Sequence, residues 1–188
     1  MKRKVFLAAA LFLALGTIGL LSQQDGNDHG QEGAVLTGGW YWHIDLQDYY
    51  GPGAGLPSLL IFHDDGTGAC SDSVAFGGIP GNVYRYTPLY GVWERKGSHK
   101  FRATFLSLRF DTTNNNLLVG ILRSRATFAF TKDSDHMTGT MHLDFLPCTG
   151  GNPLACPNPL LAQESDWQPW GGIPDLKFTG ARTSVVPY

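Results

Sequence analysis

Glu94 is the carboxylate with the most apolar context in the sequence, directly after Trp93. Burial of this side chain would raise its pKa and suit it to acid–base catalysis. Glycoside hydrolysis would need a second carboxylate, and Asp111 is a candidate only by default. The alternative that we favour is a salt bridge from Glu94 to a neighbouring strand, without a role in catalysis.

His142 and Asp144 are two residues apart, which places both side chains on one face of a predicted strand. The carboxylate could orient the imidazole for base catalysis. The alternative is an exposed polar ladder that faces Arg123 or Arg125 on the neighbouring strand. The sequence contains no H-x-H, no H-E-x-x-H and no paired Cys/His spacing, so it predicts neither a metal site nor a cofactor.

The aromatic residues are numerous enough to line a cavity or to fill one solidly, since pockets and cores use the same residue types. Three small residues on the face that we expect to point inward, Gly120, Ser124 and Ala126, favour some internal space. The residues that we expect to contact an apolar ligand are Trp42, Phe62, Phe128, Phe130, Met141 and Phe145.

Short strands must position these side chains, because no long segment has the helical spacing of apolar residues. The expected strands are 38–45, 57–63, 68–75, 89–97, 100–110, 116–131, 136–146 and 176–184. Their short links, rich in Asp, Asn and Gly, predict an antiparallel meander. Closure would remove its unpaired edges. The expected fold class is therefore all-β, an eight-stranded antiparallel up-and-down barrel, with a sandwich as the alternative.

Alternation along two of these strands predicts which side chains point into the barrel. In 116–131 and 136–146, apolar residues alternate with polar and charged ones. We expect the apolar face to point inward and the face that carries Arg123, Arg125, His142 and Asp144 to point outward.

The segment 147–175 contains six prolines and cannot be a central strand. We expect a long Pro-rich flap over one end of the barrel, before the last strand. The alternative is a surface excursion whose tryptophans plug an open end. Cys148 and Cys156 bracket a short loop in this flap, and we expect them to form a disulfide. Cys70 is then a buried apolar residue or, alternatively, a reactive thiol.

The N-terminus has the three parts of a secretory signal peptide: basic residues 2–4, an apolar run at 5–21 and a small, polar exit. We therefore expect a signal peptide over 1–22, with an uncleaved anchor as the alternative. Residues 23–34 are predicted to be a flexible leader and residues 35–188 the barrel domain. The mature chain is expected to be secreted or periplasmic.

Net charge limits the partners of the chain. The sequence has 14 basic and 16 acidic residues, a net charge of −2, and removal of three basic residues with the signal peptide leaves −5. An anionic surface disfavours phosphate backbones and anionic lipids. We expect no nucleic acid partner and no stable membrane insertion after cleavage. The oligomeric state stays open.

Gly38-Gly39-Trp40 opens the first predicted strand and Arg182 lies in the last, an arrangement that resembles the calycin superfamily, which includes the lipocalins. In that superfamily a basic residue of the last strand packs over the tryptophan of a G-x-W motif and closes one barrel end. The resemblance implies these roles for Gly38, Trp40 and Arg182. The runs 57–63 and 91–95 are similar to small secreted bacterial proteins without an assigned activity, which favours a bacterial source.

The resemblance implies a secreted barrel that binds a small apolar molecule in its lumen, with the flap and the loop 77–86 at the rim. Allene oxide cyclase-like barrels are the first alternative, because they fold an apolar substrate without a cofactor. The polar participant would then be Tyr84, Tyr86, Glu94 or His142. The second alternative is a packed barrel without a pocket that acts as an interaction protein.

Overall fold

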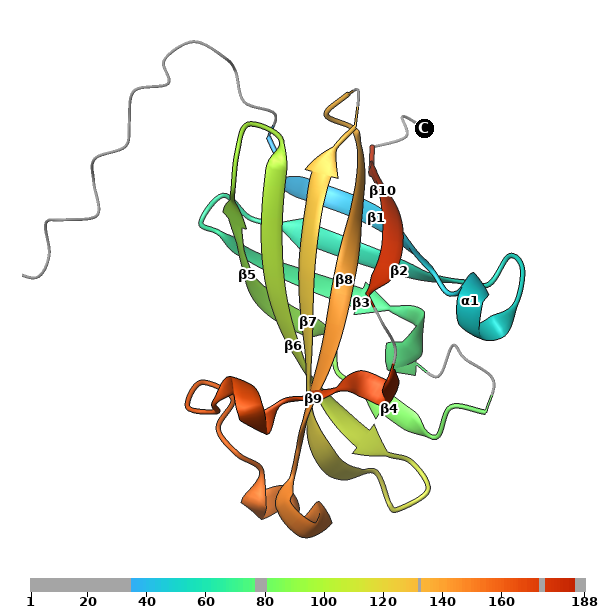
Figure 1. The fold of residues 1–188 in the computed structure, drawn as a ribbon, viewed down its shortest axis with the longest axis vertical. Coiled ribbons are helices and arrows are strands. Elements are labelled where there is room, and N and C mark those ends of the chain that lie inside the picture. Colours follow the sequence, from blue (N-terminus) through green and yellow to red (C-terminus); the bar gives the residue numbers. More distant parts are fainter. Residues whose placement is uncertain (1–34, 77–80, 132, 173–174, 185–188) are drawn as a thin grey trace, which may run out of the picture. The chain divides into compact units, whose positions relative to one another are not determined.

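Eight antiparallel strands form a closed barrel in the computed structural model (Figure 1), which describes residues 35–76, 81–131, 133–172 and 175–184. The strands are β1 (Gly38–Asp45), β2 (Gly55–Phe62), β3 (Thr67–Asp72), β5 (Leu89–Arg95), β6 (Lys100–Asp111), β7 (Leu117–Phe130), β8 (His136–Pro147) and β10 (Leu176–Arg182). The predicted signal peptide and leader lie outside the described residues.

Strand β10 closes the sheet because it pairs with both β1 and β8. The predicted eight-stranded barrel is therefore confirmed, and the predicted strand ends differ from the observed ones by at most three residues. Turn chemistry explains the agreement. Asn115 and Asn116, between β6 and β7, have φ values of 53° and 55°, in the left-handed region that Asn tolerates.

Several short elements were not predicted from the sequence. They are α1 (Gln47–Tyr50), η1 (Ser73–Phe76), β4 (Tyr84–Tyr86), η2 (Thr149–Gly151), η3 (Pro153–Ala155), η4 (Glu164–Asp166), β9 (Gln168–Pro169) and η5 (Trp170–Gly172). Strand β4 pairs with β6 and β9 pairs with β8, both at the lower ends of the long strands in Figure 1. The expectation of a loop throughout 77–86 is thus wrong for residues 84–86.

Arg182 of β10 packs against Trp40 of β1. Trp40 is 0% exposed, and the guanidinium carbon of Arg182 lies 4.4 Å from the centroid of its indole. Arg182 donates hydrogen bonds to the carbonyl of Thr37 (2.8 Å) and to the carboxylate of Asp135 (3.0 Å). Gly38 has a φ of +120°, and a Cβ there would lie 3.2 Å from an Arg182 nitrogen, so a larger residue would be strained.

The half of the barrel next to this contact is filled by aromatic rings. Phe128 is at the centre of the cluster, and its ring contacts four others. The rings that pack there are Trp40, Trp42, Phe62, Trp93, Phe101, Phe128, Phe130 and Phe178.

The flap 147–175 packs on the outer wall of the barrel as well as over its end, which corrects the predicted position. Trp167 forms a small buried cluster with Ile121 and Leu146. Arg123 lies over the Trp167 ring at 4.1 Å and makes two hydrogen bonds of 2.8 Å to Glu164 of the flap. These contacts attach the flap to the outward face of β7 and β8.

The predicted disulfide between Cys148 and Cys156 is confirmed, and it joins residues eight apart in sequence. We expect replacement of both cysteines by serine to lower the free energy of unfolding by about 2–3 kcal/mol, because the bridge restricts the unfolded chain. Urea denaturation of the oxidised wild type and the double variant checks this value. Equal stabilities would contradict it.

Candidate functional site

The barrel encloses a cavity of about 480 Å³ on the side of the aromatic cluster that faces β4 and β9. Each of the eight barrel strands contributes to its wall, and α1, β4, β9 and η5 contribute to its rim. Tyr50 of α1 and Pro169 of β9 are exposed at this rim, so solvent reaches the cavity there.

The cavity exists because inward side chains become smaller along several strands. On β2, inward positions change from Phe62 to Ser58. On β6 they change from Phe101 to Ser107. On β7 they change from Phe128 to Ser124. Rings therefore fill one half of the barrel, whereas serine leaves space in the other.

The walls combine apolar surface with polar groups that lack partners. Five buried side-chain atoms form no hydrogen bond within the described part of the chain, and all five residues line the cavity. They are Trp42 Nε1, Ser58 Oγ, Tyr86 OH, Ser107 Oγ and Arg109 Nε. Buried polar groups are nearly always paired, so this concentration points to polar atoms of a bound molecule or of water.

Arg109 is held between two aromatic rings inside the cavity. Its guanidinium carbon lies 3.6 Å from the centroid of the Tyr84 ring and 4.7 Å from that of Phe145. Gly120 makes this packing possible, since a Cβ there would lie 2.4 Å from the Phe145 ring. The space that we expected Gly120 to leave for a ligand is thus occupied by Phe145.

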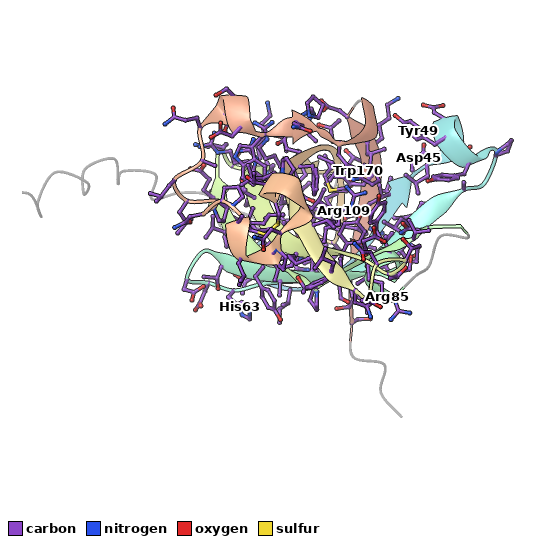
Figure 2. All side chains as sticks on the ribbon, turned by 90° about the horizontal axis from the view of Figure 1, so that it is seen from below. Asp45, Tyr49, His63, Arg85, Arg109 and Trp170 are labelled. Carbon is purple, nitrogen blue, oxygen red and sulfur yellow. A yellow bond between two sulfur atoms is a disulfide. The ribbon has the colours of Figure 1, made fainter. Side chains whose placement is uncertain are left out.

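Figure 2 shows the barrel from below, with Arg109 and Trp170 close together near the centre of the view. Both residues line the cavity. Arg85 and His63 lie toward the periphery of the same view, and both side chains are exposed. The flap thus supplies Trp170 to the site that contains Arg109, while Trp167 packs on the outer wall.

Tyr86 and Asp72 are two further ionisable groups that line the cavity. Burial raises the pKa of Tyr86, and the nearby positive charge of Arg109 opposes this shift. Burial also raises the pKa of Asp72, although its carboxylate accepts a hydrogen bond of 3.0 Å from the Ala75 N–H. The cavity therefore favours the protonated forms of both groups.

We expect Asp72→Asn to stabilise the fold at pH 7 and to change it little at pH 3. The raised pKa means that folded Asp72 binds its proton more tightly than the unfolded chain does. The wild type therefore loses stability as the pH rises through the folded pKa, and it keeps this contribution below about pH 4, the unfolded pKa. Asn still accepts from Ala75. Urea unfolding at pH 3, 5 and 7 tests this, and a difference independent of pH would contradict it.

Cys70 also lines the cavity, and burial raises the pKa of its thiol to about 12. The thiolate is the reactive form of cysteine, so this thiol is unreactive at neutral pH. The structure favours the buried apolar residue over the reactive thiol.

Glu94 lies on the outer wall and not in the lumen, which corrects its candidacy as a lumen acid. Its side chain is 47% exposed and forms ion pairs with Lys96 and Arg102. Hydrogen bonds from these two cations lower its pKa. The salt bridge that we favoured is the observed arrangement.

His142 also points outward, as the polar ladder predicts, so it cannot act on a molecule in the lumen. Its Nδ1 lies 2.7 Å from Asp175, and its Nε2 lies 3.1 Å from Asp144. Arg125 is its partner residue on β7. His142 and Glu94 both line an outer groove, separate from the cavity.

The residues expected to contact a ligand divide between the cavity and the aromatic cluster. Trp42, Met141 and Phe145 line the cavity, as do Tyr84 and Tyr86. The three that pack in the cluster are Phe62, Phe128 and Phe130.

Sequence reasoning missed Asp72, Ser58, Ser107 and Arg109. A signal for Arg109 was present, because it is in phase with the inward residues Phe105 and Ser107 of β6.

No protein family, no characterised protein and no solved structure matches this chain. Within the described residues, no group of three or more His, Cys, Asp or Glu side chains is placed to hold a metal ion. Among the same residues, no helix is long and apolar enough to cross a membrane. Fold and site thus define a closed eight-stranded antiparallel β-barrel with an internal cavity.

Proposed function

We propose that this protein binds a small, largely apolar molecule in the barrel cavity, as a calycin-like binding protein. The observation that carries the proposal is the cavity of about 480 Å³ inside the closed barrel, next to a cluster of packed aromatic rings. Its volume falls in the range of about 300–1,000 Å³ typical of ligand pockets.

Further features support the calycin-like assignment and a secreted or periplasmic location. Arg182 lies over the Trp40 ring at 4.4 Å, a contact that supports the closing role that the resemblance implies for these two residues. The Cys148–Cys156 disulfide is typical of oxidising compartments, which is consistent with the predicted signal peptide. The proposal also includes a bacterial source, which is favoured by the similarity of the runs 57–63 and 91–95 to small secreted bacterial proteins.

Titration with a neutral apolar fluorophore, N-phenyl-1-naphthylamine, tests the binding function. Trp42 and Trp170 line the cavity, so energy transfer from tryptophan to the fluorophore should accompany binding. We expect saturable binding of one molecule per chain, which is lost when urea unfolds the protein. Binding that never saturates, or no transfer, would contradict the proposal.

A second candidate is a cofactor-free isomerase or cyclase in the same cavity. It is favoured by Asp72 and Tyr86, which lie in the cavity with raised pKa values and could exchange protons with a substrate. Chromatography of a bound molecule before and after incubation separates the two functions. Conversion that Asp72→Asn abolishes indicates an enzyme, whereas unchanged ligand indicates a binding protein.

A further inference from the structure

We infer that the ligand is an amphipathic monocarboxylate whose carboxylate is bound by Arg109 and Tyr86 and whose apolar body fills the rest of the cavity. This inference rests on the proposed binding function and adds the chemical class of the ligand. Three features of the cavity support the inference. They are the N–H groups of Arg109, the hydroxyl groups beside Arg109, and the apolar side chains that line the remainder of the wall.

Arg109 offers a positive charge at the cavity, and the carboxylate of Asp111, two residues further along the chain, interacts with it only electrostatically. No ion pair joins Arg109 to an acidic group in the described part of the chain, and its Nε is buried without a hydrogen-bond partner. Arg109 is only partly buried, but its buried Nε–H has no acceptor, and the two cation–π contacts do not supply one.

The packing of Arg109 selects the shape of its partner. The guanidinium lies against the rings of Tyr84 and Phe145, so a ligand must approach it at N–H groups that these rings leave uncovered. The planar edge of a guanidinium matches a planar carboxylate with two parallel hydrogen bonds.

Hydroxyl groups beside Arg109 add neutral donors. Tyr86 and Arg109 are directly paired residues of β4 and β6, so their side chains share one face of the sheet. Ser107 is in phase with Arg109 on β6. Tyr86 is 8% exposed and Ser107 is 3% exposed. The Ser107 hydroxyl has no partner among the described residues, and the Tyr86 oxygen faces the Trp170 side chain, which can only donate to it, so both hydroxyl groups are left with a proton to donate. A carboxylate has enough lone pairs for all three side chains.

The cavity wall carries one carboxyl group among its described residues, and this group does not neutralise Arg109. Asp72 forms no ion pair with Arg109 and accepts a hydrogen bond from the Ala75 N–H instead.

The remainder of the wall fits an apolar body. Leu60, Leu122, Met141, Leu143 and Leu176 all line the cavity. The lining therefore combines the positively charged side chain of Arg109 with an extensive apolar surface. A ligand of matching polarity has one anionic end and an otherwise apolar body.

The test compares two ligands of equal chain length, dodecanoic acid and dodecan-1-ol, as displacers of N-phenyl-1-naphthylamine. We expect wild-type protein to bind the acid at least 10-fold more tightly than the alcohol at pH 7. Arg109→Gln should weaken acid binding by about 10- to 100-fold, the usual range for hydrogen bonds to charged groups, and should leave alcohol binding unchanged. Tyr86→Phe should weaken acid binding by a smaller factor and provides a second test if Arg109→Gln fails to fold.

Arg102→Gln is the matched control, because Arg102 lies on the same strand but is exposed on the outer wall. Arg102→Gln should change neither the affinity for dodecanoic acid nor the affinity for dodecan-1-ol. Equal affinities of the wild type for acid and alcohol, or an equal loss of both in Arg109→Gln, would overturn the carboxylate site and leave the binding function intact. Wild-type protein that binds none of the three compounds would overturn both proposals.

Discussion

Replacement of Phe128 by Ala is expected to lower the free energy of unfolding by about 3–5 kcal/mol, the usual cost of deleting a buried phenylalanine ring. Phe128 is 2% exposed. Its ring centroid lies between 5.3 and 6.1 Å from those of Trp42, Phe62, Phe101 and Phe178. Because strands paired all around the barrel surround this ring, the neighbours cannot collapse fully into the space it leaves.

Urea denaturation monitored by circular dichroism measures this loss. Ile61→Ala is the matched control, since Ile61 is 43% exposed on the outward face of β2 and its replacement should cost less than about 1 kcal/mol. A loss of less than about 1 kcal/mol for Phe128→Ala would show that the aromatic cluster is not the centre of the folded barrel.

Ser107→Phe is expected to weaken fluorophore binding at least 100-fold while it raises stability. The Ser107 hydroxyl is buried without a partner, which costs about 1–3 kcal/mol, and the substitution removes this cost. The new ring would occupy the cavity and bury apolar surface there. A single change thus acts in opposite directions on binding and on stability.

The matched control for this variant is Leu108→Phe. Leu108 follows Ser107 on β6 but is 39% exposed on the outward face, so the same ring added there should change neither property. Unchanged binding by Ser107→Phe would place the bound molecule outside the cavity. A large loss of stability would show that the space near Ser107 cannot accept a ring.

The strands and the barrel could be predicted because their signals are local. Alternation of apolar and polar residues and Asn- or Gly-rich turns act over a few residues. The division into a filled half and a cavity is different, because Ser58, Ser107 and Ser124 come from three strands. The stagger between barrel strands decides which inward residues lie at one level, and one sequence does not reveal that stagger.

Two errors have a simple geometric cause. Glu94 was interpreted from its neighbour Trp93, but successive residues of a strand point to opposite faces, so Trp93 packs inward while Glu94 is exposed. Arg109 was overlooked because a charged residue on an inward face needs packing partners. The two aromatic rings that pack against it come from other strands, β4 and β8. Tyr84 lies in a segment predicted to be a loop, and Phe145 was expected to contact a ligand.

Native mass spectrometry of the mature protein, purified from its own host, tests the central claim most directly. We expect one small molecule retained per chain and released when the protein is denatured, and we expect Ser107→Phe prepared in the same way to carry none. Fragmentation of the released molecule should identify one carboxyl group on an otherwise apolar body. Wild-type protein that carries no molecule, or Ser107→Phe that retains the same one, would contradict a ligand-binding cavity.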